Sequence, residues 1–180
     1  KAPVGGCDVS QPAQPQAVPS ERPVEATILA FIAVFAATAL VAALGALASA
    51  GDADPWYAAL NKAPGTPPGF VFGIAWPTLY TLMAVGACIV WRAGGGWKRA
   101  DSALGLYFLQ LVANLGWSYL FFRYHLATAA LIDIAALWVL AFMMTREFHR
   151  HSRIAAMMQY PYLAWLTFAA YLNTWIVVAN

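Results

Sequence analysis

The sequence predicts an all-α membrane protein, a bundle of five transmembrane helices. Of its 180 residues, 62% are hydrophobic and only 10% are charged, whereas about 25% of the residues in soluble domains are charged. Five apolar runs lie between the charged segments, each long enough for the roughly 20 residues with which a helix crosses a bilayer. No run shows the sustained apolar–polar alternation that is typical of transmembrane β-barrels.

The five runs place the helices in one domain, residues 26–180. The expected helices are about 26–49, 70–91, 102–122, 127–147 and 155–178. The first is rich in alanine, and small residues let helices approach closely in lipid. Prolines crowd the second half of the loop between the first two helices and exclude a regular helix there, whereas residues 56–60 can form one short amphipathic turn.

Residues 1–25 differ from the rest in composition, with five prolines and three glutamines. Such a segment buries too little apolar surface to offset the entropy of ordering, so we expect a disordered or extended tail. It lacks the apolar core of a signal peptide. Cys7 in this tail and Cys88 in the second helix have no metal-ligand spacing, and we expect both to be free thiols.

Lysine and arginine gather on one side of the expected membrane. Eight of the ten lie in the tail, in the second loop or in the fourth loop; they are Lys1, Arg22, Arg92, Lys98, Arg99, Arg146, Arg150 and Arg153. Positively charged loops stay in the cytoplasm, which places the N-terminus inside and the C-terminus outside. The net charge of +2 and the lack of a basic patch argue against a nucleic-acid partner.

Aromatic and amide side chains recur at helical spacing in three of the expected helices. The stripes are Trp76, Tyr80, Met83 and Ala87; Gln110, Asn114, Trp117, Ser118 and Phe121; and Pro161, Trp165, Phe168, Ala169 and Leu172. Amides inside a bilayer need partners, so these faces should point into the bundle. The spacing alone leaves two interpretations open: contacts between helices with tryptophans at the interface, or an aromatic cavity for a flat apolar ligand.

Few ionisable groups lie where they would suit catalysis or metal binding. Asp133 is the one acid in the interior of an expected span, either as a hydrogen-bonding partner of neighbouring groups or as part of a transport or proton path. The three histidines, His125, His149 and His151, all lie at span ends. We therefore predict no catalytic residue, no metal site and no required cofactor.

Three long motifs stand out. One is WYxxLNKAPGTPPGFVFGxxWxxLY from Trp56, the second is QLxxNxxWSxxFF from Gln110, and the third is PYLxWxxFAxxLN from Pro161. Together they resemble the translocator protein / tryptophan-rich sensory protein family, which includes the peripheral-type benzodiazepine receptor. The resemblance covers about residues 26–180.

The resemblance implies a bacterial member that forms a homodimer in the lipid bilayer of the cell membrane, with an outer membrane as the alternative. It implies porphyrins, haem among them, as ligands rather than cofactors, together with sterols such as cholesterol and synthetic benzodiazepine-type compounds. By motif position the family's pocket falls on Trp56, Tyr57, Pro67, Trp76, Asn114, Trp117, Trp165 and Ala169. Phe121 and Phe168 of the same stripes complete the expected ligand-binding site.

The expected function is a multi-pass membrane receptor or sensor that binds tetrapyrroles and regulates tetrapyrrole or stress responses. Flat tryptophan walls would stack on a macrocycle. Two alternatives stay open: an enzyme that degrades porphyrin photo-oxidatively, and a transporter of tetrapyrroles or sterols.

The charge asymmetry predicts on which side of the membrane the C-terminus lies. A reporter fused after Asn180 should lie outside the cytoplasm, because the second and fourth loops carry the positive charge. A reporter inserted in the second loop, near residue 95, is the matched control and should lie inside. A cytoplasmic signal after Asn180 would contradict either the five spans or their orientation.

Overall fold

Five apolar helices make up most of the computed structural model, which describes residues 23–49, 54–98 and 100–180. By length and composition all five can cross a membrane, and the described residues contain no strand. The expected all-α membrane fold is thereby confirmed. Residues 1–22 of the expected tail, including Cys7, lie outside the described residues.

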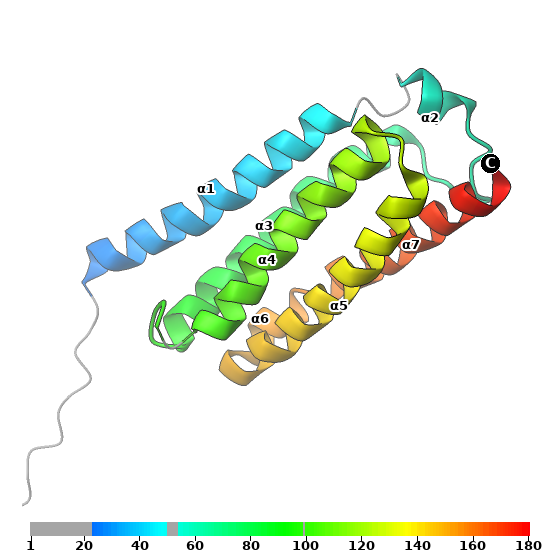
Figure 1. Cartoon of the computed structure of the whole chain (residues 1–180). Helices are drawn as coiled ribbons and strands as arrows, with labels where there is room; N and C mark the ends of the chain where they lie inside the picture. The colour runs from blue at the N-terminus through cyan, green and yellow to red at the C-terminus, as the bar shows by residue number, and fades with distance from the viewer. Residues whose placement is uncertain (1–22, 50–53, 99) are drawn as a thin grey trace, which may run out of the picture.

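The helices follow one another in a simple up-and-down order (Figure 1). They are α1 (Val24–Ala48), α2 (Pro55–Ala59), α3 (Gly69–Ala93), α4 (Asp101–Ser118) with the π-helical turn η2 (Tyr119–Arg123), α5 (Ala127–His151), α6 (Arg153–Met157) and α7 (Tyr160–Ala179). α1 packs on α3 and α4, α4 packs on α5, and α5 packs on α7. α3 completes the bundle by contacting α6 and α7.

Two long helices depart from the regular helices expected at their positions. α4 widens at its end, where Tyr124 N donates to Tyr119 O at 2.9 Å across five residues. The last expected helix is divided into α6 and α7, and α7 restarts with Pro161 in its first turn. Proline has no N–H to donate and fits the first turn of a helix, where such donors lack partners in any case.

Buried polar side chains join α3, α4 and α7 across the centre of the bundle. Tyr80 Oη donates to Asn114 Oδ1 at 2.5 Å, and Asn114 Nδ2 donates to Tyr162 Oη at 3.2 Å. Tyr162 Oη in turn donates to Gln110 Oε1 at 2.8 Å. We call Tyr80, Gln110, Asn114 and Tyr162 the central network. All four are buried, so the bundle supplies the partners that lipid cannot.

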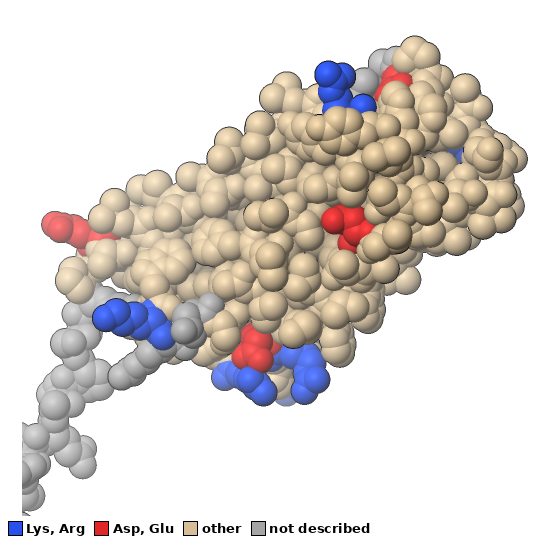
Figure 2. All heavy atoms as spheres, viewed as in Figure 1, with Lys and Arg blue, Asp and Glu red and all other residues tan. Residues whose placement is uncertain are grey.

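Charged side chains lie mainly at the ends of the bundle. Figure 2 shows a broad uncharged surface, with Lys and Arg gathered where α5 meets α6. Large apolar side chains are exposed along the helices between the ends, among them Ile32 on α1, Ile74 on α3 and Ile132 on α5. Such a surface suits lipid, which accepts apolar side chains at no cost.

Gly86 is expected to be required for the contact of α3 with α6. A Cβ at this position would lie 2.3 Å from Gln159 Nε2 and 3.3 Å from Ala155 O. Gly86→Leu should therefore destabilise the protein by about 1–3 kcal/mol, the usual cost of overpacking. Gly105→Leu on α4 is the control, because a Cβ there meets nothing within 4 Å. Equal melting temperatures for the two variants would contradict a tight contact.

Candidate functional site

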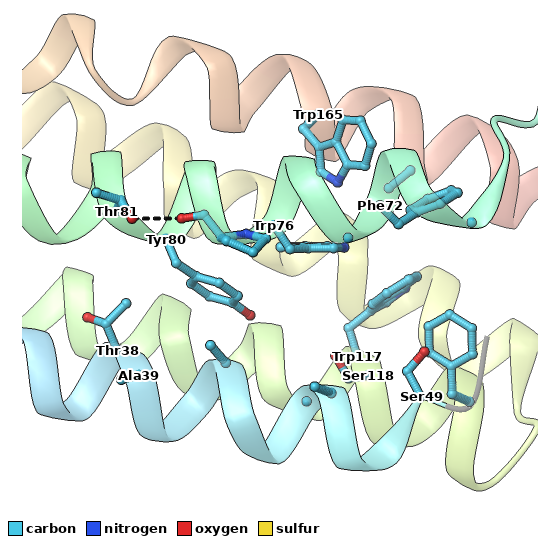
Figure 3. A pocket seen from close by; sticks show the side chains of 18 of the residues that line it. Thr38, Ala39, Ser49, Phe72, Trp76, Tyr80, Thr81, Trp117, Ser118 and Trp165 are labelled. Carbon is cyan, nitrogen blue, oxygen red and sulfur yellow. Dashed lines mark hydrogen bonds between the residues drawn. The ribbon is translucent and has the colours of Figure 1, made fainter.

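A cavity of about 610 Å³ lies between α1, α3, α4 and α7. Its volume falls within the roughly 300–1,000 Å³ that is typical of small-molecule sites. Three indole rings converge on it from different helices: Trp76 from α3, Trp117 from α4 and Trp165 from α7 (Figure 3). The cavity therefore offers flat aromatic surfaces on several sides.

Aromatic contacts hold the rings at large angles to one another. Trp165 meets Trp76 edge-on, with centroids 6.3 Å apart and an interplanar angle of 82°. It also meets Phe72 edge-on, with centroids 5.6 Å apart. Edge-to-face pairs of this kind are favoured by the charge distribution of the rings. Trp76 and Trp165 thus form a corner of the cavity.

The two indole N–H groups of Trp117 and Trp165 differ in their partners. Trp117 Nε1 donates to Asn173 Oδ1 at 3.2 Å, and Asn173 Nδ2 donates to Ala127 O at 2.9 Å. Trp165 Nε1 is buried and has no acceptor among the described residues. A buried donor without a partner costs about 1–3 kcal/mol, so Trp165 stands out as a wall residue with unused hydrogen-bonding capacity.

The other polar groups of the wall are mostly hydroxyls engaged within the protein. Thr81 Oγ1 donates to Pro77 O at 2.8 Å, and Ser118 Oγ donates to Asn114 O at 3.3 Å. Thr38 Oγ1 shares a hydrogen bond with Tyr107 Oη. No Lys, Arg, His, Asp or Glu is among the described residues that line the cavity. The interior therefore suits an uncharged, apolar body.

The cavity opens sideways between α1 and α3. Wall residues on both of these helices are exposed on the outer surface of the bundle: Phe35, Ala39 and Ala46 on α1, and Gly73, Pro77 and Thr81 on α3. This surface belongs to the apolar spans and faces the lipid. A ligand dissolved in the bilayer would therefore meet the cavity directly.

Residues 54–68, which we call the cover loop, close one end of the cavity and contribute Tyr57 and Pro67 to its wall. Asp54 Oδ1 accepts a hydrogen bond from Trp56 N at 2.9 Å and so caps α2. The far part of the loop is held by α7, since Asn61 N donates to Asn180 Oδ1 at 2.8 Å and Tyr171 Oη donates to Pro64 O at 3.2 Å.

Asp54 is ionised more readily than an ordinary aspartate. Partial burial raises the pKa of Asp54, but hydrogen bonds from His125 and from the backbone N–H groups of Trp56 and Tyr57 outweigh it and lower the pKa below its ordinary value. Asp54 thus contributes stability that is present above its unfolded-state pKa and lost as the pH falls through its lowered pKa.

Six of the ten residues expected from the sequence line the cavity: Tyr57, Pro67, Trp76, Trp117, Trp165 and Ala169. The other four lie behind or beside it. Asn114 is 1% exposed and belongs to the central network. Phe121 stacks on Trp117, Trp56 stacks on His125, and Phe168 stacks on Tyr171.

The motifs gave no indication of the α1 wall. α1 supplies Phe35, Thr38, Ala39, Ala42, Gly45 and Ala46, and Ser49 follows its last residue. Apart from Phe35 these residues are small, which is the one signal in the sequence, and small residues also occur wherever helices pack closely. Asp133 lies outside the cavity wall, facing Gly116 of α4, where a Cβ would lie 3.5 Å from Asp133 Oδ1. Its Oδ2 is buried without a partner among the described residues.

A protein family and several known proteins match most of this chain. The profile of the TspO/MBR family matches residues 31–178. The translocator protein of Bos taurus is 40% identical over 131 residues, 72% of this chain and 78% of that protein. The tryptophan-rich protein TspO of Archaeoglobus fulgidus is 35% identical over 154 residues, 85% and 98% of the two chains. The tryptophan-rich sensory protein of Cereibacter sphaeroides is 35% identical over 136 residues, 74% and 84% of the two chains.

Asn114 is expected to act on stability, because it is the shared partner of Tyr80 and Tyr162. Hydrogen bonds between helices in membranes contribute about 0.6–1.7 kcal/mol each, so Asn114→Leu should cost about 1–3 kcal/mol and lower the melting temperature. Thr174→Val is the control, since Thr174 Oγ1 donates to Ala170 O of its own helix on an exposed face. If both variants melt like the wild type, the central network does not hold the bundle together.

Proposed function

The chain belongs to the TspO/MBR family of membrane sensor and receptor proteins, and we propose that its ligand is a porphyrin or another flat apolar molecule bound in the tryptophan-walled cavity. The proposal rests above all on one observation: Trp165 lines the cavity, yet its Nε1 has no acceptor among the described residues. A small rotation of the indole would bring this donor to an acceptor on a ligand.

The shape and polarity of the cavity support a macrocycle with an apolar face. Indole rings provide stacking surface for a flat ring system, and the described wall carries no charged side chain that such a face would have to desolvate. Polar edge groups of the ligand would lie toward the cover loop. There Lys62 Nζ lies 4.4 Å from the ring centroid of Tyr57, a wall residue, and can attract a carboxylate at the rim.

The sensing role follows from coupling between ligand and helices. A ligand bound between α1, α3, α4 and α7 contacts four of the five spans, so occupancy would change how they pack. In a bacterial cell membrane this change would report tetrapyrrole level and so regulate tetrapyrrole or stress responses. Sterols and benzodiazepine-type compounds would occupy the same cavity, and a homodimer would couple two such sites.

Transport is a second candidate function, favoured by the sideways opening between α1 and α3. An opening toward lipid would let a tetrapyrrole or a sterol exchange between the cavity and the bilayer. Flux of protoporphyrin into sealed proteoliposomes would support transport, and saturable binding without flux would support the receptor.

Trp165→Phe tests the proposed site. It keeps an aromatic ring but removes the indole N–H, so protoporphyrin affinity should fall about two- to twelvefold, equivalent to a net hydrogen bond of about 0.5–1.5 kcal/mol. Trp175→Phe on the same helix is the matched control, because Trp175 is 37% exposed and lies outside the wall.

Affinity is measured by titrating the purified proteins with protoporphyrin and following the absorption spectrum and tryptophan fluorescence. Melting temperatures of both variants, recorded in parallel, separate a loss of binding from a loss of folding. The proposal is wrong if the wild type does not bind protoporphyrin, or if folded Trp165→Phe binds it as tightly as Trp175→Phe.

A further inference from the structure

A histidine in the turn between η2 and α5 is joined to the beginning of the cover loop. His125 Nε2 lies 3.0 Å from Asp54 Oδ2, although the two residues are 71 positions apart. The imidazole also stacks on the indole of Trp56, with centroids 4.4 Å apart and planes inclined by 15°. The Asp54 side chain is 12% exposed and that of His125 is 40% exposed, so bulk water reaches the pair from the histidine side.

The backbone at His125 is held in an uncommon conformation. Its φ is 56°, and no other non-glycine residue among those described has a positive φ. L-residues adopt this left-handed region seldom, and asparagine, aspartate and histidine accept it most often. The local backbone accounts for it: His125 follows the end of η2, where Leu126 N donates to Leu120 O at 2.8 Å, and helices commonly end with one left-handed residue. The turn fixes the place of the imidazole, which then contacts Asp54 and Trp56.

Aromatic contacts connect this pair to the cavity wall. Trp56 meets Phe121 edge-on, with centroids 5.5 Å apart, and Phe121 stacks on the wall residue Trp117 with centroids 5.3 Å apart. Tyr57, the next residue after Trp56, is itself part of the wall. Phe121 reaches these partners from the π-helical turn η2, and such turns are frequent at functional sites. A change in the bond between Asp54 and His125 would therefore be transmitted to two wall residues, Trp117 and Tyr57.

Few other charged groups face His125 in the described part of the chain. Asp54 is the ionised side chain within hydrogen-bonding distance, next to α2. Arg123 and Tyr124 precede His125 on its own segment and are exposed. α5 and α7 face the histidine across a hollow with Thr128, Asn180 and apolar side chains. Protonation of the imidazole therefore changes its interaction with Asp54 and, through a cation–π contact, its stacking on Trp56.

We propose that His125 and Asp54 are positioning residues of the cavity, which hold the cover loop closed more firmly when His125 is protonated. Imidazole is the side chain whose ordinary charge change falls between pH 5 and 8. A protonated ring makes a charge-assisted bond to the carboxylate of Asp54, and a neutral ring makes a weaker hydrogen bond. The pKa of Asp54 is lowered, so its carboxylate stays ionised through this pH range.

Hydrogen exchange of the cover loop tests this inference without any ligand. Exposed ion pairs stabilise weakly, so protection of residues 54–62, corrected for intrinsic exchange rates, should be about two- to fivefold higher at pH 5.5 than at pH 8. His125→Asn should abolish the difference, and asparagine accepts the left-handed backbone. Asp54→Asn should reduce it, because only the contact of the imidazole with Trp56 remains, while asparagine still caps α2.

The control is His149→Asn, which removes an exposed histidine from the far end of α5 and should leave the pH dependence intact. A wild type with pH-independent protection would overturn the inference, as would a folded His125→Asn variant that keeps the pH dependence. Melting temperatures identify a variant that has not folded, and Asp54→Asn then provides the independent second measurement.

The consequence for the ligand rests on the proposed function and is measured separately. Protoporphyrin should leave the wild type about two- to fivefold more slowly than it leaves His125→Asn at pH 5.5, and the ratio of the two rates should be smaller at pH 8. Comparison at each pH removes the titration of the porphyrin itself. If no porphyrin binds but exchange is pH-dependent, the proposed function fails and the role of His125 stands. If porphyrin binds but exchange is pH-independent, the role of His125 fails and the proposed function stands.

Discussion

Lipid offers no hydrogen bonds, so every polar group within the spans must find its partner inside the protein, and this constraint shapes the whole bundle. Asn114 meets this requirement at the centre, since its amide accepts a hydrogen bond from Tyr80 of α3 and donates one to Tyr162 of α7. Asn173 does the same nearer one end, where it joins Trp117 of α4 to the first turn of α5. Without a hydrophobic force between helices in lipid, such bonds and close packing define the arrangement.

The apolar character of the cavity follows from these hydrogen bonds. Gln110 and Asn114 of α4 bond to α7, and Asn173 of α7 bonds to α5. Because these amides are used between helices, they contribute no donors or acceptors to the cavity wall. The wall is left to rings and small side chains, with Trp165 Nε1 as a buried donor without an acceptor among the described residues. A ligand bound in such a cavity would be selected by shape and stacking, and Trp165 Nε1 could orient it by a hydrogen bond.

The two ends of the bundle differ in their chemistry. One end carries the exposed arginines where α5 meets α6, which suit an aqueous boundary rich in anionic headgroups (Figure 2). At the other end the cover loop, η2 and the end of α7 lie together (Figure 1), joined by Asp54, His125 and Asn180. The cover loop is thus attached by a few exposed hydrogen bonds, which water and pH can alter.

Charge-free runs of about 20 residues can be recognised one at a time, because the bilayer sets their length. The sequence therefore predicted five helices in an all-α fold, and its motifs predicted the family. The structure confirms the helices, and the family match confirms the motifs. Helical spacing likewise brought Trp76, Trp117 and Trp165 to inward faces. Spacing cannot tell an amide that faces a cavity from one that faces another helix, so the place of Asn114 emerged only once α3, α4 and α7 were packed together. The α1 wall and the pairing of Asp54 with His125 depended on packing as well, because small residues carry little pattern and contacts across 71 positions arise only when the chain folds.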